Sequence, residues 1–376
     1  MEETEQKGAE STTIGCEGCG ASLKYKPGTN HMKCDYCGAE NKIKSTLKQI
    51  HELNYSFYKS FKKNIVTDTE GKEEEKERFV KCTNCKATSS VDKNLKSAFC
   101  PYCSSPLLIE DTDTNDIIKP ESLLPFKIEK EEAKENFKKW IRKLWFAPNN
   151  LKSTFDIDHF KGIYIPYWTY DTFTLNAYRG ERGIYYYVNE SYTTTENGKT
   201  VTKTKRVRKT RWYSVRGNVN VFFDDLLVPA TNSLPEKYLN KLEPWDLENL
   251  VPFNKSYLSG YITEKYQIEL EDGFEKAKKL TTDRINTAIR NDIGGDDQRI
   301  SNVDTDYANI TFKHTLFPVY VSAYNYNGKL YQFLINGRTN EVQGQRPYSW
   351  IKITLTVLAV MTVIFLVYYY SINYYT

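Results

Sequence analysis

The chain has 376 residues, enough for two or three domains. Its 29 Tyr, 18 Phe and 6 Trp, together with 27% charged residues, exclude a largely disordered protein and predict a folded globular one. The formal net charge is only +4, which disfavours a general nucleic-acid binder with a strongly basic surface.

The N-terminal residues 1–12 are polar and acidic, and we expect them to form a disordered tail. They lack the apolar core of a secretory signal peptide. We therefore expect the chain to stay in a reducing compartment, where its eight cysteines would be free thiols rather than disulfides.

These cysteines form two arrangements with the same spacing. In each, two C-x₂-C pairs are separated by fourteen residues. The first set is Cys16, Cys19, Cys34 and Cys37, and the second is Cys82, Cys85, Cys100 and Cys103. A C-x₂-C turn directs two sulfurs to one point, and a returning hairpin brings the second pair to the same point. We predict two zinc ribbons, at residues 13–44 and 79–110, each holding one structural Zn²⁺ ion. Four sulfur ligands leave no open coordination position, which disfavours a catalytic or redox role.

Zinc ribbons bind either protein or nucleic acid. Each predicted ribbon has a charge of +2 before its metal site adds −2, so neither is cationic once metal is bound. This balance favours a protein-docking role, with nucleic acid as the alternative.

The remainder of the soluble part is expected to be an α+β domain. Residues 45–78 combine a short amphipathic stretch with a charged run, which we interpret as a linker. Residues 117–349 form an aromatic-rich domain with many antiparallel strands. Apolar residues at helical spacing predict helices at residues 130–146 and 273–291 within it.

A long β-hairpin is predicted around Asn197-Gly198, a dipeptide typical of tight hairpin turns. Its second arm, residues 199–216, has eight basic residues and no acidic one. This ribbon is either an ordinary solvated surface or a site for anionic lipid, nucleic acid or an acidic partner. The residues assigned to such a site are Lys203, Lys205, Arg206, Arg208, Lys209 and Arg211.

The sequence contains no complete enzyme motif. The four histidines, His31, His51, His159 and His314, have no metal or triad neighbour in sequence. The Lys199-Thr200 pair resembles the end of a phosphate loop, but Thr193 stands where that motif needs glycine. Acidic residues 292–297 lack the spacing of a calcium loop, and we predict that they end a helix. We expect no catalytic activity.

Near the C-terminus, residues 353–370 contain no charged side chain. Such a helix is about 27 Å long, close to the ~30 Å hydrocarbon core of a bilayer. The alternative is a buried core helix, which rarely runs this long without a polar face. We predict one transmembrane helix at residues 351–372. Basic Arg338, Arg346 and Lys352 on its N-terminal side would keep the bulk of the chain in the cytoplasm, anchored by its tail in the cell (inner) membrane.

Several segments together resemble a bacterial family of double-zinc-ribbon proteins, often labelled primosomal protein N′-like or replication-restart helicase-like, with ribbons of the transcription-factor-IIB type. Besides the paired ribbons, they are LPFKI from Leu124, WFAPNNL from Trp145, YIPYWTYD from Tyr164, YRGERG from Tyr178, FDDLLVPA from Phe223, LEPWDL from Leu242, NDIGGDDQRI from Asn291 and INGRTNEVQGQRP from Ile335. Only the ribbons support the helicase label, because the ATPase motifs are absent. Asn340 departs from the family, which tends to have glycine in that turn.

Family members with a C-terminal span resemble components of membrane-stress operons, beside phage-shock-protein-A-like and SPFH-domain proteins. The resemblance implies a non-enzymatic scaffold that recruits such partners to the membrane during envelope stress. The alternative is a membrane-tethered nucleic-acid-binding protein associated with replication.

Overall fold

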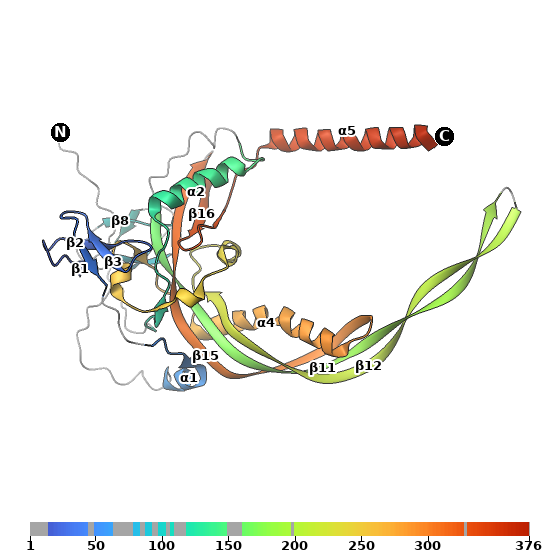
Figure 1. Ribbon diagram of the computed structural model, residues 1–376, viewed down its shortest axis with the longest axis horizontal. Coiled ribbons are helices and arrows are strands. Elements are labelled where there is room, and N and C mark those ends of the chain that lie inside the picture. Colours follow the sequence, from blue (N-terminus) through green and yellow to red (C-terminus); the bar gives the residue numbers. More distant parts are fainter. Residues whose placement is uncertain are drawn as a thin grey trace.

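The computed structural model describes residues 14–43, 49–62, 78–82, 87–91, 97–102, 106–108, 118–148, 160–196, 199–326 and 329–375. The predicted tail at residues 1–12 lies outside them. The chain is a multidomain α+β protein with many antiparallel strands (Figure 1).

Three long antiparallel strands organise the body: β11 (Lys161–Glu196), β12 (Lys199–Pro229) and β15 (Asp297–Tyr326). They lie in the order β12-β11-β15 within a nine-stranded sheet. The other members are β5 (Leu53–Asn54), β10 (Ser122–Leu123), β13 (Val251–Pro252), β14 (Ile262–Thr263), β16 (Lys329–Asn336) and β17 (Val342–Gly344). The predicted hairpin is confirmed, since Glu196 pairs with Lys199, although the turn at 197–198 lies outside the described residues.

Two helices cover the sheet, and both lie close to their predicted positions. Helix α4 (Leu270–Ile293) packs along the base of β11 and β12 and ends at Gly294, which has a φ of 66°. The acidic segment therefore ends a helix, as predicted. Helix α2 (Lys130–Lys143) stops three residues earlier than expected, because the Leu144 N–H turns back to the Ile141 carbonyl.

Shorter helical pieces connect these elements. They are α1 (Tyr55–Lys62), α3 (Glu236–Leu239), η3 (Asn240–Leu242), η4 (Leu247–Asn249) and η5 (Lys255–Leu258). Part of the predicted linker, residues 49–62, belongs to the body, because β5 pairs with β15 and α1 follows directly. In the turn after β16, Asn340 has a φ of 66°, a left-handed conformation that asparagine tolerates.

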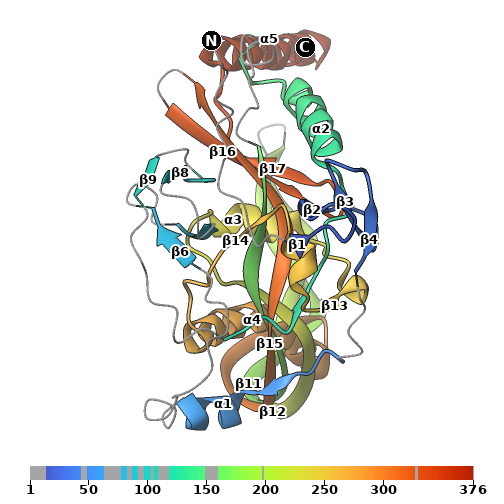
Figure 2. The ribbon, with the colours of Figure 1, turned by 90° about the vertical axis from the view of Figure 1, so that its left-hand side faces the viewer.

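The N-terminal ribbon is a small sheet of β1 (Ile14–Gly15), β2 (Ser22–Tyr25), β3 (His31–Cys34) and β4 (Glu40–Lys42). Its buried side chains belong to the same hydrophobic cluster as Phe126 and Phe137 of the body. The Tyr25 ring meets Tyr257 edge-on at a centroid distance of 5.1 Å. The ribbon is therefore packed against the body (Figure 2).

The second cysteine-containing region consists of two short hairpins. Strand β6 (Arg78–Lys81) pairs with β7 (Thr88–Val91), and β8 (Ser97–Phe99) pairs with β9 (Pro106–Leu108). Tyr102 follows β8, is fully buried, and donates a hydrogen bond of 2.8 Å to Glu264 Oε2. This region is thus also tied to the body through a buried carboxylate.

The C-terminal helix α5 (Trp350–Tyr375) projects away from the body (Figure 1). Within it, Trp350–Asn373 has a mean hydropathy of 2.3 and none of its most apolar stretch is buried. The helix is therefore not part of the hydrophobic core of the described chain. By length and composition α5 is able to cross a membrane.

Candidate metal centre and cationic arm

The four cysteines of the first ribbon converge on one point. Their sulfurs all lie within 4.8 Å of one another. The closest pairs are Cys16 with Cys37 at 3.7 Å and Cys19 with Cys34 at 3.5 Å. Sulfurs at the corners of a tetrahedron around Zn²⁺, with Zn–S bonds of ~2.3 Å, are about 3.8 Å apart. The arrangement therefore fits one tetrahedral metal ion.

Two equivalent turns create this convergence. The Cys16 N–H donates to Ala21 O at 2.7 Å, and the Cys34 N–H donates to Ala39 O at 3.0 Å. Each turn contains a glycine in the left-handed region, Gly20 with a φ of 73° and Gly38 with a φ of 74°. A side chain at either position would strain the turn, because other L-residues rarely adopt this φ.

The four sulfurs influence one another's ionisation. The Cys37 backbone N–H lowers the pKa of Cys34 to about 7, so this thiol ionises readily. The Ala21 N–H also lowers the pKa of Cys19, but the hydrogen bonds with the sulfurs of Cys37 and Cys34 outweigh it and raise that pKa to about 12. Four thiolates repel one another without a counter-ion, and a divalent cation removes that repulsion.

The second cysteine set has two of its four members among the described residues. Cys82 and Cys100 are buried, while Cys85 and Cys103 lie outside the described residues. The Cys82 N–H donates to Ala87 O at 2.7 Å, the same closure as in the two turns of the first ribbon. This local likeness supports the prediction of a second metal site without showing its ligand set.

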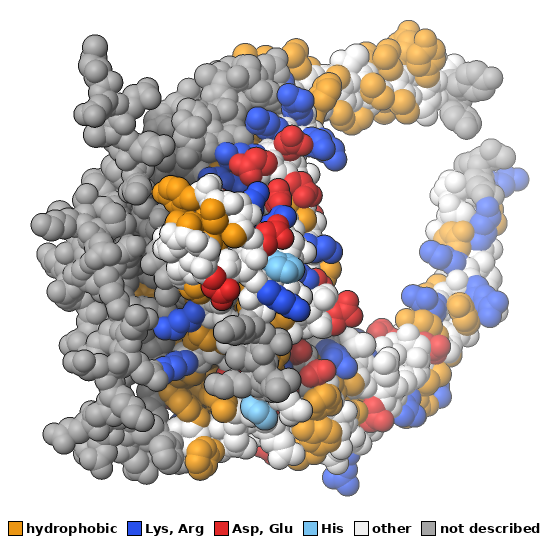
Figure 3. All heavy atoms as spheres, turned by 60° about the vertical axis from the view of Figure 1, so that its left-hand side comes forward, with side chains coloured by type: hydrophobic (Ala, Val, Ile, Leu, Met, Phe, Trp, Pro, Cys, Tyr) orange, Lys and Arg blue, Asp and Glu red, His pale blue; other side chains and the backbone are white. Residues whose placement is uncertain are grey.

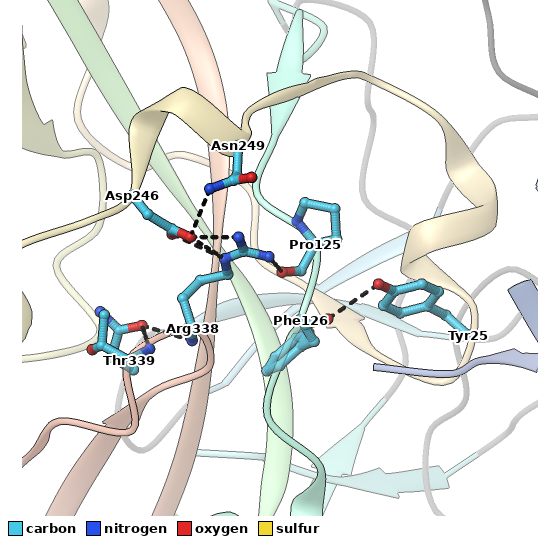
Figure 4. A network of polar contacts seen from close by, with 8 residues as sticks. Tyr25, Pro125, Phe126, Asp246, Asn249, Arg338 and Thr339 are labelled. Atoms are coloured by element: carbon cyan, nitrogen blue, oxygen red, sulfur yellow. Dashed lines mark hydrogen bonds and ion pairs between the residues drawn. The ribbon is translucent and has the colours of Figure 1, made fainter. Parts of the chain in front are cut away.

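A polar network holds the first ribbon against the body (Figure 4). Arg338 follows β16 and donates through Nε to both carboxylate oxygens of Asp246, at 2.9 and 3.0 Å. Its Nη1 donates to Pro125 O at 3.1 Å, and the next carbonyl, Phe126 O, accepts from Tyr25 Oη at 3.1 Å. Burial raises the pKa of Asp246, but the hydrogen bonds and charge of Arg338 overcome it and lower that pKa below its usual value.

The cationic hairpin extends beyond the sheet as a two-stranded ribbon. Strand β15 accompanies β11 only as far as the pair Gly183↔Asp297, whereas β11 and β12 stay paired out to Glu196↔Lys199. We call residues 184–196 and 199–211 the arm. Its Lys and Arg side chains alternate with hydrophobic ones along the ribbon (Figure 3).

The register divides the predicted basic residues between two faces of the arm. Residues paired across the strands share a face, and successive residues alternate. One side, the lysine face, carries Lys199, Lys203, Lys205, Lys209 and Arg211 opposite even-numbered residues of β11. The other side, the arginine face, carries Arg206 and Arg208, whose guanidinium groups lie 4.2 Å from the ring centroids of Tyr187 and Tyr185. The six predicted residues are therefore divided between the two faces of the arm.

A buried lysine contacts an acidic group in the sheet. Asp171, Asp224 and Asp225 approach closely enough to suggest a metal site. However, Lys313 Nζ lies 2.9 Å from Asp225 Oδ1 and 3.9 Å from Asp171 Oδ2. Its side chain is only 9% exposed, so the ammonium supplies one buried positive charge to this acidic group.

Of the four histidines, His159 lies outside the described residues, and His314 is buried in the core. The ring of His314 is tilted against that of Trp168, with 4.9 Å between the ring centroids, and its Nδ1 lies 2.7 Å from Ile118 O. Because a carbonyl only accepts, Nδ1 must carry the proton. Complete burial lowers the pKa of His314 to about 4.

Comparison with known proteins gives a relative but no function. No family model matches the chain, and no solved structure matches it. The uncharacterised protein YdjG of Bacillus subtilis (strain 168) is 26% identical over 339 residues, which is 89% of each chain. The similarity therefore extends over most of the chain rather than one motif.

Proposed function

We propose that the chain is a non-enzymatic, membrane-anchored adaptor that recruits soluble proteins to a membrane surface. The observation that carries this proposal is the exposed apolar helix α5, which is fastened to the body without a long stalk. Only five residues separate the end of β17 at Gly344 from Trp350. The body is thereby held at the bilayer surface.

The junction between helix and body supports this role. Lys352 Nζ donates to the carbonyls of Trp145 and Ala147, at 3.1 and 2.8 Å. Trp145 is 73% exposed and Trp350 is 80% exposed. Tryptophan is enriched at the membrane–water interface, so this junction suits the headgroup region. The basic residues at this end favour a cytoplasmic location for the body at the cell (inner) membrane.

In this proposal zinc has a structural role in both ribbons. Cys16, Cys19, Cys34 and Cys37 would hold one ion, and the second cysteine set would hold another. Each ion would fix the shape of a docking surface and supply no chemistry. The family resemblance suggests phage-shock-protein-A-like and SPFH-domain proteins as partners in an envelope-stress response.

A nucleic-acid-binding role is the second candidate, and the basic arm is the observation that favours it. The first ribbon argues against it, because two of its lysines are paired with acids. Lys24 Nζ lies 2.7 Å from Asp35, and Lys26 Nζ lies 3.1 Å from Glu40. These pairs leave less positive charge for phosphate groups.

Two measurements separate the candidates. Full-length protein purified in mild detergent should capture the same soluble proteins from lysate before and after nuclease treatment, and Cys34→Ser should abolish that capture. Under the nucleic-acid reading, the chain would instead bind DNA or RNA at physiological salt and lose affinity steeply as salt rises. Capture that vanishes with nuclease would contradict the adaptor proposal.

A further inference from the structure

Charge is distributed unevenly along helix α2. Its first seven residues include three acids and two lysines, whereas its last six, residues 138–143, include four basic residues and no acid. Cations at the end of a helix offset its macrodipole, but only within the last turn, which accounts for Arg142 and Lys143. Lys138 and Lys139 are exposed earlier in the helix, and neither forms an ion pair within the described residues. This basic end therefore needs a further explanation.

The basic end of α2 adjoins the base of α5. Just after α2, Phe146 O accepts from the Ser349 N–H at 2.7 Å, and Trp145 O accepts from Lys352 Nζ at 3.1 Å. Figure 1 and Figure 2 both show the two helices close together at this point. The segment that leads into α5, residues 345–353, adds two more basic residues and no acid. The fold therefore brings six basic residues from two acid-free segments to the base of α5.

Exposed aromatic rings lie among these cations. Trp145, Trp350 and Tyr348 are all exposed, and the Arg346 guanidinium lies 5.3 Å from the centroid of the Tyr348 ring. Indole and phenol rings favour the interfacial layer of a bilayer, where the lipid phosphates also lie. Guanidinium and ammonium groups bind phosphate oxygens through charge-assisted hydrogen bonds. The chemistry of this surface therefore matches lipid headgroups that carry a net negative charge.

The position of the surface also favours lipid as its occupant. Helix α5 leaves the body here, so the leaflet that its first turns enter lies next to these groups. The tendency of basic residues to stay on the cytoplasmic side of a span concerns residues near that span in sequence. Here the contact of Lys352 with Trp145 joins positions 207 apart, and four of the six basic residues belong to α2. The fold, and not the anchor sequence alone, assembles the surface.

We propose that this surface, which we call the anchor-base site, binds the phosphate groups of anionic lipids in the leaflet next to the body. This inference rests on the membrane anchoring in the proposed function. The opposite face of α2 packs Phe137 on Phe333, with 3.6 Å between the ring centroids, in the cluster shared with the first ribbon. Bound lipid would thus fix the orientation of the body and the first ribbon on the membrane. The anchor-base site consists of Lys138, Lys139, Arg142, Lys143, Arg346 and Lys352, with Trp145 and Trp350 beside them.

Crosslinking from the two ends of α2 tests the site in the full-length chain. The photo-crosslinker p-benzoylphenylalanine replaces Trp145 or, as the control, Glu131 in the first turn, about 20 Å away along the helix. Each protein is reconstituted in vesicles of equal parts phosphatidylcholine and phosphatidylglycerol. We expect position 145 to give mainly phosphatidylglycerol adducts, in a proportion that falls as salt rises, and position 131 to give few adducts of either lipid. Equal adducts of the two lipids at position 145, or as many adducts from position 131, would overturn the proposal.

A charge-matched pair of variants tests the basic end of α2. Arg142→Gln with Lys143→Gln should remove most of the phosphatidylglycerol excess at position 145, because losing two charges next to an anionic leaflet weakens binding about 30-fold. Lys130→Gln with Lys134→Gln removes the same charge from the other end of the helix and should leave the excess nearly unchanged. All four substitutions introduce a good helix former. Equal losses in the two variants, or no loss in the first, would contradict a site at this end of α2.

The remaining outcomes assign the surface to another ligand. Loss of the phosphatidylglycerol excess in millimolar inorganic phosphate at constant ionic strength would indicate a site for free phosphate and would overturn the lipid proposal. Crosslinks from position 145 mainly to a protein or to nucleic acid in native membranes would also overturn it. Membrane fractionation of every variant keeps the two proposals separate. A chain absent from the membrane fraction refutes the anchoring itself, whereas an anchored chain without a preference for phosphatidylglycerol refutes only the anchor-base site.

Discussion

Replacing Cys34 tests whether a metal ion maintains the first ribbon and its contact with the body. Cys34 is fully buried between the ribbon and the body cluster. The Cys34→Ser variant loses one of four sulfur ligands, and structural zinc sites in isolated fingers contribute roughly 10–16 kcal/mol. We expect the variant to lose this metal ion and the hairpin that it closes.

The size of the expected stability loss follows from the side chains that the ribbon buries. Leu23, Tyr25, Met32 and Ile43 are between 2% and 5% exposed and pack in the shared cluster. Burying each such side chain contributes about 1.5–3 kcal/mol, so roughly 6–12 kcal/mol of burial depends on an ordered ribbon, as an upper bound. The backbone amides of the ribbon should therefore lose nearly all protection against hydrogen exchange.

The assay combines metal analysis with hydrogen exchange on the full-length protein in detergent. Met32→Ala is the control, because it removes a core side chain without touching a sulfur. It should destabilise the ribbon by about 2–5 kcal/mol and keep the metal. A Cys34→Ser protein with unchanged metal content and unchanged amide protection would refute the reasoning.

Three further predictions concern the body. The pKa of His314 is about 4 in the folded state, against an ordinary value of 6.5, so the unfolded state takes up this proton first as the pH falls. The free energy of unfolding should therefore decrease by about 3 kcal/mol between about pH 6.5 and about pH 4. In urea titrations His314→Asn should remove this part of the pH profile, and an unchanged profile would contradict the assignment. Gly273→Ala should lower the unfolding free energy by about 1–3 kcal/mol despite its better helix propensity, because the added Cβ overlaps the hydroxyl of Tyr170; a stabilised variant would refute that contact. Arg338→Lys keeps the positive charge but loses the guanidinium hydrogen bonds to both carboxylate oxygens of Asp246. The same titration should show an unfolding free energy lower by about 2 kcal/mol, and an unchanged value would show that the network is dispensable.

The local features of the fold could be predicted because each depends on residues close together in sequence. The C-x₂-C spacing brought Cys16, Cys19, Cys34 and Cys37 to one point, since turns and a short hairpin need no distant partner. Apolar spacing located α4, and the Asn-Gly signal located the long hairpin.

The packing of the ribbon on the body could not be predicted. The hydrogen bond from Tyr25 to Phe126 O joins residues 101 positions apart, and no local pattern indicates such a pairing. The same is true of His314, whose burial follows from the sheet register and from Trp168 on a neighbouring strand. Long-range packing selects these partners after the local elements form.

The division of the arm into two faces was missed although the sequence contains the signal. A two-residue turn at 197–198 fixes the register, so Glu196 must face Lys199. Counting outward from that pair separates Lys203 and Lys205 from Arg206 and Arg208. The basic residues were grouped by charge alone, and charge does not indicate on which face of a strand a side chain lies.

The most direct test of the adaptor role is the location of its captured partners with and without α5. Cells that produce the full chain, or a chain ending before Trp350, are separated into membrane and soluble fractions, and the partners identified by capture are quantified in each. The adaptor role predicts that these partners are in the membrane fraction with the full chain and become soluble with the shortened one. Partners that distribute identically in both strains would contradict it.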